Sequence, residues 1–260
     1  MLLPTMTLDE LYNAVYGDEI FIREKLDVAA KVFRKSAIKQ RSVPFKGKYS
    51  YKNYKSNIIY TIYLIAFTRS QWSNPQLAIT TSYTHDEGTT MLMIDLLNNK
   101  EMALIDTHFW SRFRERYLKD KSLSTQETID FFMYNYNTMS IVDGVMHVDE
   151  EKADENTEYF ASVSPLGVFY CEKLNENKKV TVFRTYLPME MLRKEQYRNV
   201  AIRYLCTYFK DYMNFYPKEA NKIDAIMESF MSKADNENWS MDKFITESEK
   251  LMDEYPLYVI

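Results

Sequence analysis

Residues 57–105 constrain the fold most strongly, because four short segments rich in β-branched and aromatic residues follow one another there. These segments are 57–67, 77–83, 89–96 and 102–105, and turn-forming residues separate them at 86–88 and 98–100. Short strands joined by tight turns usually pair with their neighbours in the chain. This part of the sequence therefore predicts an antiparallel meander.

Further strands are predicted after two helices that begin near residues 107 and 125. They fall at 141–142, 159–163, 167–172 and 180–187. Together with the meander they predict an α+β fold built on a mainly antiparallel sheet.

Helices are predicted at both ends of the chain. Thr7 and Glu10 form a capping-box pattern ahead of a first helix, and residues 21–40 have amphipathic spacing, whereas 42–56 is predicted as a polar loop. From Pro188 onward only helix is predicted, with breaks near Pro217 and 236–238. Residues 1–187 are thus expected to form an α+β domain. Residues 188–260 are expected to form a helical C-terminal third, either a separate region or part of the same domain.

Composition excludes several classes of protein. The 260 residues are 46% hydrophobic and 15% aromatic, enough for a packed core, and the five glycines form no GxGxxG, GxxxxGK[ST] or GxSxG motif. Cys171 and Cys206 lack metal spacing, and the three histidines form no HExxH pair, so neither a metal nor a cofactor is expected. The chain opens without a signal-peptide pattern, and its longest apolar run, 58–67, is too short to span a bilayer. The sequence predicts a cytoplasmic protein with no membrane partner.

Charge is distributed unevenly along the chain. Residues 28–85 contain ten lysines and arginines and no acidic residue, whereas 143–158 is strongly acidic. A basic region of this kind can steer an anion, or can attract the acidic segment across the fold. The acidic segment does not match a calcium-binding loop and is interpreted as solvated.

One polar stripe carries the main candidate for chemistry. In a helix that starts near Asp106, the side chains of His108, Arg112 and Arg116 follow one another at intervals of four residues, each about 40° further round the axis. An imidazole can take a proton, and two guanidinium groups can hold a phosphate, which is what metal-free RNA cleavage needs. The alternative is a solvated helix face in which Glu115 pairs with a neighbouring cation.

The order of elements around this stripe resembles a known group of nucleases. The string His108-xxx-Arg112-xx-Glu115-Arg116, between a strand and an amphipathic helix, resembles RelE-like and BrnT-like toxin domains of the barnase/EndoU/colicin/RelE-type ribonuclease group. The resemblance covers residues 102–187, about a third of the chain. It implies that His108 is the base or acid, that both arginines clamp phosphate, and that Thr185 or Tyr186 on the last strand donates a proton. Such toxin domains are small and basic, however, whereas this chain is large and acidic.

A second candidate is the basic and aromatic segment within 42–56. Its tyrosines could stack the bases of a single-stranded nucleic acid while the lysines hold phosphates, and its candidate residues are Lys48, Tyr51, Lys52, Tyr54 and Lys55. The alternative is an edge strand whose tyrosines pack inward and whose lysines prevent association with other strands.

Two functions from different classes follow from the sequence. The first is a metal-independent ribonuclease, or an RNA-binding protein that keeps only the phosphate clamp. The second is a non-enzymatic protein-interaction module that uses its tyrosines, its methionines and the C-terminal helices. The position of Tyr186 relative to His108 distinguishes them, because the ribonuclease needs both at one surface.

Overall fold

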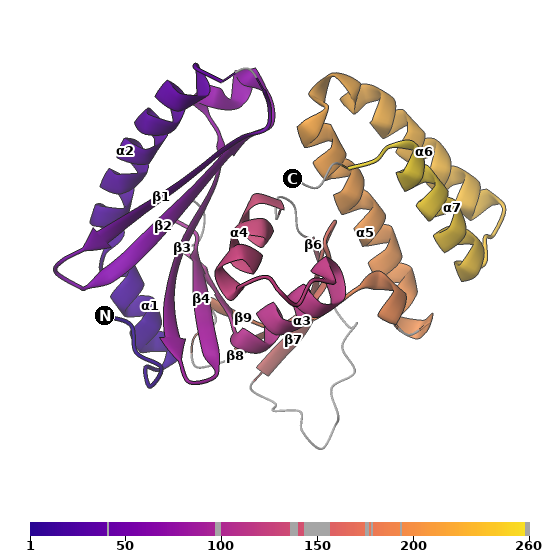
Figure 1. The fold of residues 1–260 in the computed structure, drawn as a ribbon. Helices are drawn as coiled ribbons and strands as arrows, with labels where there is room; N and C mark the ends of the chain where they lie inside the picture. The colour runs from indigo at the N-terminus through magenta and orange to yellow at the C-terminus, as the bar shows by residue number, and fades with distance from the viewer. Residues whose placement is uncertain are drawn as a thin grey trace.

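In the residues that it describes, the computed structural model is centred on a nine-stranded sheet (Figure 1). The structure describes residues 1–40, 42–96, 100–135, 140–142, 157–174, 177, 179–192 and 194–257. The strands are β1 (Phe45–Asn53), β2 (Ile58–Ala66), β3 (Gln76–His85), β4 (Gly88–Ile94), β5 (Met102–Ile105), β6 (Ser140–Val142), β7 (Thr157–Ser164), β8 (Gly167–Leu174) and β9 (Val180–Leu187). Within this part of the chain they lie in the order β1-β2-β3-β4-β5-β9-β8-β7-β6.

Two antiparallel meanders make up this sheet. Strands β1 to β5 pair in chain order, as do β6 to β9. The meanders meet where β5 pairs with β9 in parallel, with Met102 opposite Val180 and Ile105 opposite Phe183. The predicted α+β fold with a mainly antiparallel sheet is therefore confirmed, although the sequence did not indicate the parallel junction.

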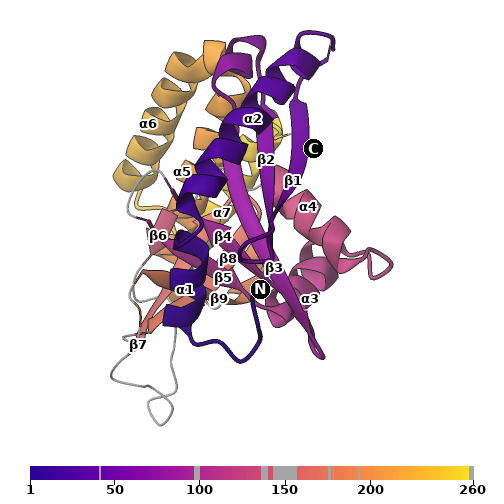
Figure 2. The same ribbon diagram turned by 90° about the vertical axis from the view of Figure 1, so that its left-hand side faces the viewer.

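Helices cover both faces of the sheet. The outer face carries α1 (Leu8–Tyr16), α2 (Glu19–Ala37) and α5 (Lys194–Phe215), whose buried side chains pack on β1–β5, β9, β7 and β8. The inner face carries α3 (Thr107–Phe113) and α4 (Thr125–Asn135). Figures 1 and 2 show α1 and α2 on one side of the sheet and α3 and α4 on the other.

The C-terminal helices continue from the sheet. Helices α6 (Ala220–Asn236) and α7 (Met241–Glu254) pack on α5 around a cluster of their own. Helix α5 also reaches the first meander, because the rings of Phe215 and Phe67 lie 4.2 Å apart. The helical C-terminal third is thus as predicted, while its status as a separate domain stays a prediction.

In the described part of the chain, no helix combines the length and the apolar character needed to cross a membrane.

Strand β1 corrects the prediction of a loop at 42–56. All nine of its residues pair with β2. Tyr49 and Tyr51 pack towards α2 on the outer face, whereas Lys46 and Lys48 alternate with them and contact α4 side chains on the inner face. The alternation of polar and aromatic residues was therefore the signature of an amphipathic edge strand.

An extra residue in β9 changes which side chains face the inner core. Cys171 lies opposite Phe183 and Tyr170 lies opposite Thr185, so Arg184 has no opposite residue. Because this bulge shifts the alternation by one, Phe183 and Tyr186 both join the inner-face cluster although they are three residues apart. The Arg184 guanidinium leaves the strand and donates to Glu172.

Candidate functional site

The predicted catalytic histidine lies at the exposed N-terminus of α3. Asp106 caps this helix by accepting a hydrogen bond from the Phe109 amide at 2.9 Å. Burial raises the pKa of Asp106, against the opposing effects of that hydrogen bond and of Arg184. The side chain of His108 points outward and is exposed, with no hydrogen-bond partner among the described residues.

Each of the two predicted phosphate-clamping arginines already has a partner. Arg112 pairs with Glu115 at 3.2 Å. The helix changes at Arg114–Leu118 into a π-helical turn, which is wider than an α-helical turn. Arg116 therefore leaves the predicted stripe, and its Nη1 donates to the backbone carbonyl of Tyr186 at 2.8 Å.

Tyr186 and Thr185 lie on opposite faces of β9. Tyr186 is 1% exposed, and its hydroxyl donates to the Leu166 carbonyl at 2.8 Å. Its ring fits against Gly167, where a Cβ atom would lie 2.6 Å from the ring and where φ is +129°. Burial raises the pKa of Tyr186 far above its usual value. The structure therefore does not bring His108, Tyr186 and Thr185 together at one surface.

The predicted nucleic-acid residues are also dispersed. Lys48 pairs with Asp130 on the inner face, whereas Tyr51 packs beneath α2 on the outer face. Tyr54 is 87% exposed in the turn after β1, with Lys52 Nζ lying 5.7 Å from its ring centroid. Lys55 belongs to the same turn, where its amide donates to Asn53. Only the tip of this hairpin combines exposed tyrosine and lysine, so no continuous stacking surface forms.

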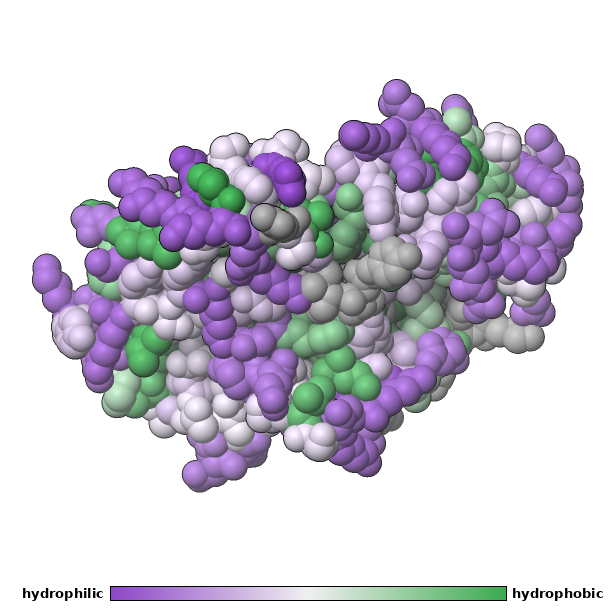
Figure 3. Space-filling view, turned by 45° about the horizontal axis from the view of Figure 1, so that its top comes forward, coloured by the Kyte–Doolittle hydropathy of each residue, from purple (hydrophilic) through white to green (hydrophobic). Residues whose placement is uncertain are grey.

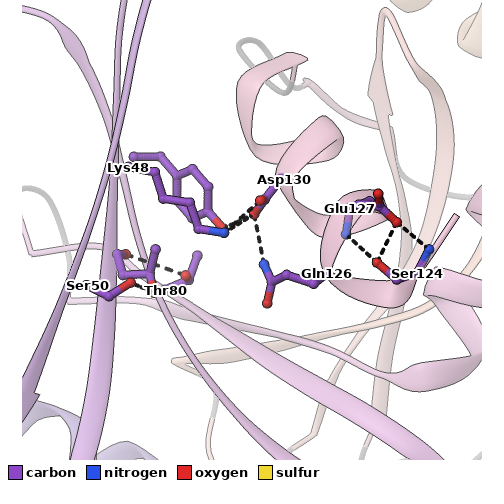
Figure 4. Close-up of polar contacts among 9 residues, drawn as sticks. Lys48, Ser50, Thr80, Ser124, Gln126, Glu127 and Asp130 are labelled. Atoms are coloured by element: carbon purple, nitrogen blue, oxygen red, sulfur yellow. Dashed lines mark hydrogen bonds and ion pairs between the residues drawn. The ribbon is translucent and has the colours of Figure 1, made fainter.

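Asp130 of α4 ties the helix to the sheet (Figure 4). Lys48 Nζ donates to both carboxylate oxygens at 2.7 and 2.6 Å. The Tyr63 hydroxyl donates at 2.7 Å and Gln126 Nε2 at 2.8 Å, both to Oδ1. Burial and the Asp130 charge raise the pKa of Tyr63. Four groups from β1, β2 and α4 thus satisfy one another, and the network leaves Asp130 unsuited to act as a free general base.

The start of α4 has its own polar contacts, also drawn in Figure 4. Glu127 Oε2 accepts hydrogen bonds from the Ser124 amide at 2.8 Å and from its hydroxyl at 2.7 Å. The Ser124 hydroxyl accepts from the Glu127 amide at 3.2 Å, which completes a capping box. These hydrogen bonds lower the pKa of Glu127. Their role is to fix the N-terminal end of the helix.

Beyond this network the inner face contains a cavity of about 930 Å³. Tyr63 and Tyr134, packed edge to face at 5.5 Å between ring centroids, lie on its α4 side. Burial raises the pKa of Tyr134 to about 12. Small side chains line it on three strands, namely Ala78 on β3, Ala103 on β5 and Thr181 on β9. Their size leaves the space above the sheet open.

The two ends of this cavity differ in burial and polarity. Phe160, Ser162 and Phe183 line the buried end and are at most 4% exposed. Glu101 and Lys173 line the more exposed end, where their charged groups lie 3.7 Å apart. The cavity is therefore a pocket with an apolar interior and a charged rim, the usual composition of a small-molecule site.

Ser162 is the polar group that the sequence did not single out. It is 1% exposed, and its hydroxyl has no hydrogen-bond partner among the described residues. Leaving a buried hydroxyl unpaired costs about 1–3 kcal/mol. The available signal was a serine between Ala161 and Val163, on the same face of the strand as Phe160 two positions earlier.

No protein-family model, no curated protein and no solved structure matches this chain. Across the described ranges, no group of three or more histidine, cysteine or acidic side chains is arranged to hold a metal ion. The acidic segment 143–156 lies outside the described residues. The functional argument therefore rests on the geometry of the chain itself.

Proposed function

We propose that this protein is a non-enzymatic binding protein and that its binding site is the inner-face cavity. The observation that carries the proposal is the unpaired hydroxyl of Ser162 within a mainly apolar cavity. A buried polar group of this kind is costly to the free protein but useful when a ligand supplies the missing partner.

The residues that line the cavity support the same conclusion. Phenylalanine and tyrosine fill the rest of the inner face, yet Ala78, Ala103 and Thr181 leave this part open. Unfilled volume costs a protein dispersion contacts, so an open pocket lowers the stability of the fold. A ligand that occupies the pocket restores those contacts.

The ribonuclease hypothesis stays a prediction with less geometric support. Arg116 and Tyr186, which it assigns to phosphate binding and proton donation, are held in the scaffold by hydrogen bonds to backbone carbonyls. His108 and the half-exposed Arg112 remain as an outward-facing pair. Because the predicted donor Tyr186 is buried and bonded to the Leu166 carbonyl, that pair supplies only part of the machinery for cleavage.

A protein-interaction function is the second candidate, and one observation favours it. Among the described side chains, the exposed large hydrophobic residues include none from α5–α7 but include Ile20, Val28 and Val32 on α2 and Ile38 directly after it. Lysines lie beside them on this helix, and Figure 3 shows hydrophobic residues among hydrophilic ones over the N-terminal part of the molecule. A protein partner is thus expected on α2 rather than on the C-terminal helices.

The cavity proposal is tested with a neutral fluorescent apolar probe, N-phenylnaphthylamine. Wild-type protein should bind it saturably, and a double variant, Ala78→Phe with Ala103→Phe, should bind it at least about tenfold more weakly because two rings occupy the space. Ala225→Phe on the exposed face of α6 is the matched control and should bind normally. The proposal is wrong if the folded wild type shows no saturable binding, or if the double variant binds as tightly.

A further inference from the structure

We infer that the ligand of this cavity is a neutral, mainly apolar molecule with one hydroxyl or carbonyl oxygen, which reaches Ser162. The inference rests on the proposed function, because it concerns the same cavity. It adds the chemical class of the ligand and the orientation in which the ligand lies.

The oxygen is assigned to the buried end of the cavity. Ser162 and Phe160 alternate with Ala161 and Val163 along β7, so that the first pair faces the inner side and the second pair faces α5. A serine hydroxyl donates one hydrogen bond and can accept others. No described side chain or backbone group satisfies it, and the hydroxyl oxygen itself has almost no accessible surface. The Ser162 side chain therefore has to rotate towards the cavity, and a ligand oxygen then gains a hydrogen bond that the free protein lacks.

Neutrality follows from the distribution of charge around the cavity. Lys173 is the only lysine or arginine among the described lining residues. It lies opposite Glu158, four positions along β7 from Ser162, so its backbone is roughly 13 Å from the backbone of Ser162. A carboxylate beside Ser162 would thus be buried with a single hydrogen bond and no cation, an arrangement that costs several kcal/mol.

The exposed end does not favour an anion either. Lys173 already pairs with Glu101, and Asp95 is a further carboxylate among the lining residues. Because Lys173 is already paired, the described lining residues offer no unpaired lysine or arginine to an anionic head group at this rim. An anionic head group is disfavoured at both ends of the cavity.

The apolar body of the ligand is assigned to the middle of the cavity. Met93 on β4, opposite Ala103, and Met133 on α4 both line it. Methionine side chains adapt to ligands of different shape. A flexible alkyl chain therefore suits this space better than a rigid polar molecule.

The experiment compares octanol, octane and octanoate as competitors of bound N-phenylnaphthylamine. Wild-type protein should bind octanol about 2–10-fold more tightly than octane, the net value of one hydrogen bond, and should bind octanoate most weakly. Ser162→Ala should remove the preference for octanol over octane, whereas Ser162→Thr, which keeps the hydroxyl, should retain it.

Ser248→Ala is the matched control. Ser248 in α7 is the other buried serine whose hydroxyl lacks a partner in the described part of the chain, and it does not line the cavity. This variant should keep the wild-type order of affinities. Circular dichroism of each variant establishes that it is folded.

Each outcome separates the inference from the function on which it rests. Equal wild-type affinities for octanol and octane overturn the hydrogen bond to Ser162, and this comparison needs no variant to fold. If octanoate binds most tightly of the three competitors, the inference that the ligand is neutral is wrong. A preference for octanol that survives in Ser162→Ala assigns the oxygen to another group and also overturns the inference. In all three cases saturable binding of the fluorescent probe leaves the proposed function standing, whereas its absence overturns both.

Discussion

The two halves of the inner sheet face have opposite characters although they share the same strands. Beneath α3 and α4 the rings of Phe109, Phe113, Phe132 and Phe169 are fully buried and pack against one another. Beyond Tyr63 the same face carries small residues and a cavity. The comparison teaches that side-chain size, rather than strand pairing, divides this face into a structural half and a binding half.

The largest expected effect comes from the packed half. Phe132→Ala should lower the free energy of unfolding by about 3–5 kcal/mol, because it removes a buried ring that contacts Phe109 and Phe113. Urea unfolding measures the loss. Phe160→Ala should cost less because one side of that ring already borders the open cavity. Equal losses in the two variants would break the distinction between the halves.

An intermediate effect is expected where the packed half meets β9. Tyr186→Phe keeps the ring but leaves the buried Leu166 carbonyl without its hydroxyl donor, so the free energy of unfolding should fall by about 1–3 kcal/mol. Urea unfolding detects it, and probe binding should stay unchanged. An unchanged stability would show that the hydroxyl is not held as the structure places it.

The pH dependence of stability tests the N-terminus of α3. Burial raises the pKa of Asp106, so the folded state binds this proton more tightly than the unfolded state does. This group therefore costs stability above its folded pKa, and the cost disappears as the pH falls towards the usual value for aspartate. Asp106→Asn keeps an N-cap and removes the titration.

Unfolding of the two proteins at about pH 7 and about pH 4 measures this difference. Lowering the pH should raise the free energy of unfolding of the wild type relative to that of Asp106→Asn. The opposite sign would mean that Arg184 and the Phe109 amide outweigh burial at this carboxyl.

The smallest effect is expected on the exposed side of α3. His108→Ala and Arg112→Ala should change the free energy of unfolding by no more than about 0.5 kcal/mol, because neither side chain is buried. RNA incubated with the wild type in excess EDTA should remain intact. Cleavage that resists the chelator and is lost in either variant would restore the ribonuclease hypothesis and give the outer side of α3 a function.

Local patterns predicted most of the secondary structure. The strands at 102–105 and 180–187, the helix start near Asp106 and the breaks between the C-terminal helices agree with the structure. These features depend on neighbours in the chain, through β-branched runs, turn residues and capping side chains. Strand β1 was predicted as a loop, with an edge strand as the alternative, because its tyrosines and lysines fit both; the structure shows the edge strand.

The candidate site depended on contacts between distant residues. The spacing of His108, Arg112 and Arg116 predicted one stripe, but a π-helical turn directs Arg116 to a carbonyl on β9, 70 residues away. The bulge at Arg184 places Tyr186 in the core, where helical or strand periodicity alone would not have assigned it. No local pattern indicated that Ser162 faces a cavity.

The sequence by itself determined the order of helices and strands, the antiparallel pairing of chain neighbours and the amphipathic faces, because short-range periodicity and turn chemistry specify them. The tertiary structure alone decided the parallel contact of β5 with β9 and the pocket that opens above it. The physical reason is that a cavity is a property of the space between side chains. Its volume depends on how residues from β3, β5, β7, β9 and α4 are brought together, and no single segment encodes that distance.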